Sequence, residues 1–416
     1  MGKRFGLPEL SIFLHRWTGL AMAAFLITVG LTGAILALEH QIDHLLNPDL
    51  HARHRHGQPK LDLATLAERA EASDPHMRVA YFAVEEDQAH IMVTGRIDPA
   101  TGKPYELNYG ELILDPWSGD VLGKAALEGN WHAALPWNRK VLPFIYSLHT
   151  SLATNTAFGW QFVGVIALLW TLDSFIAFYL TLPRGSGTFW RRWRQAWKIK
   201  WNANSTRVHF DLHRAGGLWL WPLLFIFGWS SVMFGLSRVY EPVMKTVFDF
   251  VSMEESLAQN SLPQPLLAPA LSWRQAEQAG DRAMAEQAVL HHFTLERPYG
   301  MAYIAEYGAY TYCARTSIDF RGHGWETTVL VDGNTGRLRS VDLARGQHLG
   351  NSIGNFLWAI HFADLRDFLP YHILVSLFGL FLATISYTGV VIWWRKRKVS
   401  LRARSGKTTH MKMQVL

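Results

Sequence analysis

The chain has 416 residues, of which 49% are hydrophobic and only 18% are charged, and its formal net charge is +6. This balance is too apolar for an ordinary soluble protein and too often interrupted for a pure membrane bundle, so we expect membrane spans combined with extramembrane domains. The single cysteine, Cys313, excludes an internal disulfide, a cysteine-ligated iron–sulfur cluster and a CxxCH haem attachment.

Four apolar stretches are long enough to cross roughly 30 Å of hydrocarbon at about 1.5 Å per residue. The first is too long for a cleavable signal peptide and ends without an A-x-A site, so we expect it to remain as an anchor. The predicted transmembrane helices cover residues 14–38, 158–182, 212–236 and 370–394.

Basic residues gather on one side of this four-span arrangement. Residues 183–207 contain seven Arg or Lys and no acidic residue, WWRKRK (393–398) follows the fourth span, and GKR (2–4) precedes the first. The positive-inside rule places these segments in the cytoplasm and the two long excursions outside, in the periplasm if the membrane is a bacterial inner membrane. Tryptophan-rich basic loops also occur in nucleic-acid-binding proteins, but between two spans the loop indicates a lipid-interface anchor, so no nucleic acid partner is expected.

Each excursion has the pattern of a small α+β domain. Apolar residues recur at helical spacing near the start of each, and alternating apolar residues with turn signals follow. The first excursion predicts a helix over 61–72, strands over 79–84 and 90–94, and a hairpin over 112–123; the second predicts a helix over 273–287 and strands near 301–305, 310–314 and 327–331.

The chain repeats its own landmarks in the same order. LHRWTGL (14–20) matches LHRAGGL (212–218), and LDPWSGDVLG (114–123) matches VDGNTGRLRS (331–340). The second pair shares an Asp-x-x-x-Gly turn between apolar residues, which is typical of a hairpin. Both halves cross the membrane in the same direction, so we predict a parallel internal duplication with a pseudo-twofold axis along the membrane normal.

The predicted fold is therefore a membrane α-helical protein with four transmembrane helices and two extramembrane α+β domains. The predicted divisions are 1–38 (N-terminus and first span), 39–141 (first periplasmic domain), 142–182 (amphipathic approach and second span), 183–211 (basic cytoplasmic loop), 212–236 (third span), 237–352 (second periplasmic domain), 353–394 (amphipathic approach and fourth span) and 395–416 (cytoplasmic tail).

Four features carry a family resemblance: the LHR openings of spans one and three, the two Asp-x-x-x-Gly turns, the LH before span two and TGVVIWWRKR at the end of span four. Through these features, nearly the whole chain resembles the PepSY-associated transmembrane proteins. The layout is similar to that of FoxB-type siderophore-iron reductases of the bacterial inner membrane, which carry b-type haem. The resemblance implies PepSY-like extramembrane domains, two non-covalent haem b groups and reduction of a periplasmic ferric siderophore with release of Fe(II).

A haem without thioether bonds is held by axial imidazoles in an apolar slot. His15 and His213 open spans that start in the cytoplasm, whereas His149 and His361 precede spans that start outside. We therefore predict two bis-histidine haem-iron sites, His15 with His213 near the inner face and His149 with His361 near the outer face.

Several residues that follow the inner histidines at helical spacing are small, beginning with Gly19 and Gly217. Small residues leave room for a flat porphyrin, although membrane helices also use them for ordinary packing. Three more histidines are reserve ligands: His372 on span four, and the repeat-matched His132 and His348, which could equally be solvated loop residues. We interpret the histidines of HARHRHG (51–57) as a polar loop rather than a metal site.

Neither a GxGxxG after a strand nor a phosphate loop is visible, so the sequence shows no binding motif for NAD or FAD. The electron donor is therefore expected to be quinol or a separate cytoplasmic reductase. Catalytic side chains stay unassigned. The partners are then the donor, membrane lipid and a ferric siderophore. Candidate exposed aromatic residues for siderophore binding, unless they belong to the core, are Trp117, Trp131, Trp137, Tyr299 and Trp325.

The alternative is a PepSY-type membrane-anchored module that binds a ligand, senses it or regulates a protease without redox activity. That alternative explains the extramembrane domains but not the duplicated histidines.

Overall fold

The computed structural model describes residues 6–125, 135–154, 156–185, 187–366 and 368–413. The chain divides into two compact units. The membrane unit comprises Met1–Ile35, Thr156–Ser237 and Leu374–Leu416, and the sheet unit comprises Leu36–Asn155 and Arg238–Ile373.

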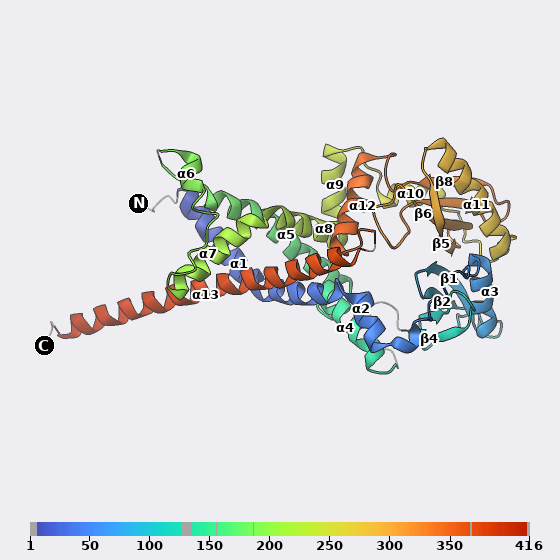
Figure 1. Cartoon of the computed structure of the whole chain (residues 1–416), viewed down its shortest axis with the longest axis horizontal. Coiled ribbons are helices and arrows are strands. Elements are labelled where there is room, and N and C mark those ends of the chain that lie inside the picture. The colour runs from blue at the N-terminus through green and yellow to red at the C-terminus, as the bar shows by residue number, and fades with distance from the viewer. Residues whose placement is uncertain (1–5, 126–134, 155, 186, 367, 414–416) are drawn as a thin grey trace. The chain divides into compact units, whose positions relative to one another are not determined.

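Three helices are long and apolar enough to cross a bilayer, so this is a multi-pass membrane protein (Figure 1). They are α1 (Leu7–Leu36), α5 (Ala157–Thr181) and the first part of α13 (Leu369–Met413), namely Leu369–Ser400. With the shorter α8, they enclose an apolar core in the membrane unit. The buried members of that core are Met22, Leu26, Val29, Trp170, Leu224, Phe378 and Leu382.

Glycines allow these helices to approach closely. A Cβ atom on Gly30 would lie 2.7 Å from the carbonyl oxygen of Gly379, and one on Gly164 would lie 2.6 Å from the carbonyl carbon of Gly235. Backbone atoms cannot move aside as a side chain can, so α1 packs on α13 and α5 packs on α8 only because these positions are glycine.

The predicted third span is not one continuous helix. Its residues form α7 (Ser205–Trp219) and α8 (Trp221–Gly235), which are bent by 69° at the break. Pro222 stands in the first turn of α8, where it lacks an N–H to donate to the preceding turn and its ring crowds the carbonyl four residues earlier. The prediction of an uninterrupted helix over 212–236 was therefore wrong at this proline.

In the sheet unit, a helix followed by four strands occurs twice. The first set is α3 (Leu63–Ser73), β1 (Met77–Val84), β2 (Ala89–Gly95), β3 (Glu111–Leu114) and β4 (Val121–Ala125), and the second is α11 (Trp273–Leu290), β5 (Leu295–Ile304), β6 (Ala309–Thr316), β7 (Thr328–Asp332) and β8 (Leu338–Asp342). The other elements are α2 (Glu39–Leu46), η1 (Pro48–Leu50), α4 (Asn138–Ser151), α9 (Ser237–Val247), α10 (Met253–Asn260) and α12 (Leu349–His361), while α6 (Phe189–Trp193) lies in the basic loop of the membrane unit.

The eight strands form one antiparallel sheet in the order β4-β3-β2-β1-β5-β6-β7-β8. The two halves meet where β1 pairs with β5, with Phe82 opposite Met301. α3 and α11 pack on the sheet and share its core with Phe82, Met284, Met301 and Tyr312 (Figure 1). The two predicted domains thus share one sheet and one core.

Both Asp-x-x-x-Gly motifs form the predicted turns. Asp115 accepts hydrogen bonds from the backbone N–H groups of Trp117 and Ser118, at 2.7 and 3.1 Å, and Gly119 has a φ of 68°. Asp332 accepts from the N–H groups of residues 334 and 335, at 3.1 and 2.9 Å, and Gly336 has a φ of 69°. These turns join β3 to β4 and β7 to β8, which confirms the hairpins.

Candidate functional site

The membrane unit brings His15 of α1 and His213 of α7 together. Their ring centroids are 6.0 Å apart and the ring planes are tilted by 48°. Two imidazoles that bind one metal from opposite sides, at about 2 Å per bond and with about 1 Å from each nitrogen to its ring centre, have ring centres about 6 Å apart. The centroid distance of this pair is therefore that expected if both histidines were to hold one metal.

The other nitrogen of each ring is engaged by the protein. His15 Nδ1 lies 2.9 and 3.1 Å from the two carboxylate oxygens of Asp173 on α5. His213 Nδ1 lies 3.0 Å from the carbonyl oxygen of Ile385 and 3.3 Å from the hydroxyl of Thr388 on α13. Metal-ligating histidines almost always donate their second N–H to a carboxylate or carbonyl, which leaves Nε2 as the ligand atom.

The two Nδ1 partners occupy matching places. Asp173 is 24 residues after His149 (173 − 149), and Ile385 is 24 residues after His361 (385 − 361). One ring is thus held by a carboxylate of α5 and the other by a backbone carbonyl of α13. Asp173 and Thr388 were both missed in the sequence, since neither lies near a histidine in the chain.

Open space lies beside the two glycines that follow these histidines. A Cβ atom added to Gly19 or to Gly217, four residues after each histidine, would meet no neighbouring atom within 4 Å. On the opposite helix, a Cβ on Gly389 would lie 3.1 Å from Cε1 of His213. Glycine at 389 therefore lets α13 pack directly on the imidazole, whereas the space beside Gly19 and Gly217 is open.

A second ring pair lies in the sheet unit. His149 is in the last turn of α4 and His361 is the last residue of α12, and their ring centroids are 6.3 Å apart. Burial and the neighbouring His149 lower the pKa of His361 to about 3. Its imidazole is therefore neutral at physiological pH, the form in which imidazole ligates a metal.

The reserve histidines have other neighbours. His372 is buried, with its Nδ1 3.5 Å from the amide nitrogen of Gln41. His348 precedes α12 and its Nδ1 lies 2.8 Å from a carboxylate oxygen of Asp249. His132 is outside the described residues.

The candidate aromatic side chains differ in exposure. Trp117 and Tyr299 are buried, so these two candidates belong to the core. The Asp115 turn folds Trp117 inward, where its indole N–H donates to the carbonyl of Gln58 at 3.1 Å. Trp137 is exposed, Trp325 lines a shallow hollow of about 430 Å³, and Trp131 is outside the described residues.

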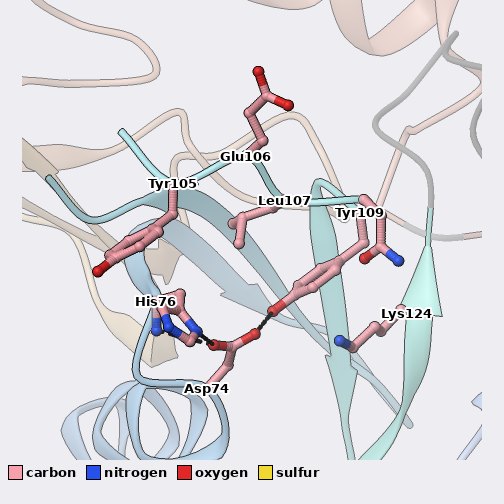
Figure 2. Close-up of a pocket in the computed structure, with 8 residues that line it drawn as sticks. Asp74, His76, Tyr105, Glu106, Leu107, Tyr109 and Lys124 are labelled. Carbon is pink, nitrogen blue, oxygen red and sulfur yellow. Dashed lines mark hydrogen bonds and ion pairs between the residues drawn. The ribbon is translucent and has the colours of Figure 1, made fainter. Parts of the chain in front are cut away.

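A second hollow, of about 450 Å³, lies beside the first four strands (Figure 2). The Tyr109 hydroxyl donates to Asp74 at 2.8 Å, and His76 Nδ1 lies 3.4 Å from the same carboxylate. Lys124 lies over the Tyr109 ring, 3.7 Å from its centre. The polar groups of these side chains thus contact one another. We therefore regard the histidine pairs, rather than this hollow, as the candidate metal or redox site.

A family model described as PepSY-associated TM region matches residues 13–396 of the chain. The matched range contains both histidine pairs and Asp173. No curated protein matches the chain.

Proposed function

Since the chain belongs to the PepSY-associated transmembrane family, we propose that it is a di-haem reductase of the bacterial inner membrane, which carries electrons outward to a periplasmic ferric siderophore and releases Fe(II). The resemblance of its layout to FoxB-type siderophore-iron reductases supports this proposal. The repeated order of one helix and four strands supports an internal duplication with PepSY-like halves.

The observation that carries the proposal is the spacing of the two histidine pairs. His15 with His213, at 6.0 Å, and His149 with His361, at 6.3 Å, each have the separation that one bis-ligated iron requires. Ordinary helix packing does not require two imidazole pairs at the same spacing. In this proposal each pair holds one haem b.

Haem, when bound, supplies a reversible one-electron couple. The chain's own residues fix the ligands: Asp173 and the Ile385 carbonyl orient the inner rings through Nδ1, and the glycines beside them leave space. Each siderophore-bound Fe(III) accepts one electron and becomes Fe(II), whose lower charge weakens its attraction to hard oxygen donors. The siderophore is left chemically intact, and the electrons come from quinol or a separate cytoplasmic reductase.

Two measurements on the detergent-purified protein test the proposal. The absorption spectrum should have a sharp Soret band with dithionite-sensitive α and β bands, and haem analysis should give two haems per chain. The reduced protein should be reoxidised by a ferric hydroxamate, with ferrozine trapping Fe(II). If a cupric complex or a quinone reoxidises the protein while ferric chelates do not, the siderophore assignment is wrong and only electron transfer remains.

A colourless but fully folded preparation would contradict the whole redox proposal. The membrane-anchored ligand-binding, sensory or protease-regulating module would then be the better description of the chain. The spectrum separates the two functions because only the reductase needs the histidine pairs to hold haem.

The proposed orientation makes a separate prediction. Alkaline phosphatase fused after Arg55 or after Gly322 should be active, since both positions lie in the predicted periplasmic segments, and fusion after Lys198 should be inactive because the positive-inside rule retains the basic loop in the cytoplasm. Green fluorescent protein at the same three positions should give the opposite result. Fluorescence after Arg55 or Gly322 would contradict this topology.

Asp173 should tune the inner haem. A carboxylate that accepts from Nδ1–H increases the donor strength of the imidazole and favours Fe(III). We expect Asp173→Asn to raise the midpoint potential of one haem by roughly 60 mV, which is about a tenfold change in its relative affinity for the two oxidation states. Spectroelectrochemical titration measures this shift, and the haem of the other pair is the internal control. Equal shifts of both haems would indicate a general structural effect instead.

A further inference from the structure

The sheet unit contains a histidine and carboxylate cluster apart from both ring pairs. Helix α2 carries His40, Asp43 and His44, at the i, i+3 and i+4 spacing that places three side chains on one helical face. His51 follows in the next loop, and Asp87 lies in the turn between β1 and β2. The ring centroids of His44 and His51 are 4.4 Å apart, and those of His40 and His51 are 5.7 Å apart.

The geometry points to a binding site for a divalent first-row transition metal ion, with His44, His51 and Asp87 as its protein ligands. One ligand atom of each residue lies within 4.8 Å of the other two. His51 Nδ1 is 3.0 Å and His44 Nε2 is 3.9 Å from Asp87 Oδ2. Donors that share a metal at about 2.0–2.2 Å are separated by about 3–4 Å, so small side-chain rotations suffice for ligation.

The second nitrogen of His51 is already placed as metal sites require. His51 Nε2 lies 3.0 Å from Asp43 Oδ2, and the side-chain amide of Asn47 donates to Asp43 Oδ1 at 2.7 Å. A carboxylate that holds one ring nitrogen directs the other toward the metal and strengthens it as a donor. The ion would replace the proton at His51 Nδ1, so one proton is released for each ion bound.

The backbone fixes this loop against the turn that carries Asp87. The N–H of Ala52 donates to the Asp87 carbonyl and the Gln88 side chain donates to the Leu50 carbonyl, both at 3.0 Å. Asp87 Oδ1 is buried and has no hydrogen-bond partner among the described residues. A buried carboxylate oxygen without a partner is costly, and a cation bound by both oxygens of Asp87 would remove that cost.

Exposure and donor type indicate which ligand enters. The side chain of His51 is 2% exposed whereas that of His44 is 57% exposed, so the site has a buried floor and an open edge for an ion and its waters. Two imidazoles and one carboxylate with open positions suit Fe(II), Zn(II) or Mn(II), and the absence of a thiolate among these ligands disfavours Cu(I). The inference does not rest on the proposed function; where both hold, the Fe(II) released by reduction is an ion of this class.

The test uses full-length protein purified in detergent without a polyhistidine tag and stripped with EDTA. Zn(II) is titrated calorimetrically, and retained zinc is measured by mass spectrometry after gel filtration. Wild-type protein should retain one equivalent. His44→Ala should weaken Zn(II) binding at least tenfold, and Asp43→Asn should weaken it about tenfold through His51. Anaerobic Fe(II) should compete for the same equivalent.

His76→Ala is the matched control, because His76 is also 57% exposed and also lies beside an aspartate, Asp74. It should retain the zinc of the wild type. Asp87→Asn keeps the size of the side chain and should lose the site, while an unchanged unfolding temperature shows that the variant folds. Failure of wild-type protein to retain zinc, or equal losses in His44→Ala and His76→Ala, would overturn the inference. Haem absorbance is recorded separately, so this result is independent of the reductase proposal.

Discussion

His15→Ala and His213→Ala each remove the same one of two haems, and His149→Ala and His361→Ala each remove the other. This result is expected because the members of each pair have the spacing of two ligands on one iron, 6.0 and 6.3 Å between ring centroids. Haem content should fall from two per chain to one in every single variant. Combining one substitution from each pair should leave a colourless protein, as measured by the pyridine haemochrome assay.

Two controls distinguish ligation from general damage. His348→Ala should retain both haems, because His348 contacts Asp249 at the start of α12. His372→Ala should also retain both haems. This variant tests whether His361 or the reserve ligand His372 binds the outer haem. If His361→Ala leaves the spectrum intact while His372→Ala removes a haem, the outer assignment is wrong.

Much of the fold is local and could be predicted. The helices α3 and α11 begin within two residues of the predicted positions. Capping residues mark both starts: Asp62 accepts a hydrogen bond from the N–H of Thr65, and Ser272 forms a capping box with Gln275. The hairpins followed from Asp and Gly at fixed spacing. These signals act within a few residues, where sequence patterns are informative.

Two of the missed features depend on contacts between distant segments. The joining of both halves through β1 and β5 follows from pairing across more than 200 residues. The carboxylate of Glu277 on α11 accepts hydrogen bonds from the N–H groups of Leu63 and Ala64, both at 3.0 Å, and so caps α3. Only the folded chain reveals this contact. The bend before Pro222 carried a local signal, since proline inside an apolar run predicts a break.

The candidate sites likewise contain some features that the sequence predicts and others that only the folded chain reveals. The predicted duplication indicates which of the four histidines pair, and the structure places the members of each pair at close range. The Nδ1 partner Asp173 was not predicted, because it lies 158 residues from His15 in the chain. His51 was interpreted as part of a polar loop, yet it is buried between Asp43 and Asp87. The spacing of EHQIDH in α2 was the available signal for that cluster.

Gly19→Leu and Gly217→Leu should each abolish or strongly weaken binding of the inner haem while the chain stays folded. A side chain at either position meets no neighbouring protein atom within 4 Å of its Cβ, so the fold can accept it. The same side chain would project beside His15 or His213, where the proposal places the porphyrin. Overpacking of this kind costs about 1–3 kcal/mol, which corresponds to roughly 5- to 150-fold weaker haem binding.

Gly30→Leu provides the contrast, because its Cβ would lie 2.7 Å from the Gly379 carbonyl oxygen and would push α1 away from α13. That variant should lower the unfolding temperature and disturb both haems, whereas the two leucine variants beside the histidines should keep the wild-type unfolding temperature and the outer haem. Haem content and thermal unfolding in the same detergent separate these outcomes. If Gly19→Leu and Gly217→Leu both retain two haems with unchanged spectra, the space beside His15 and His213 faces lipid, and the inner haem cannot lie there.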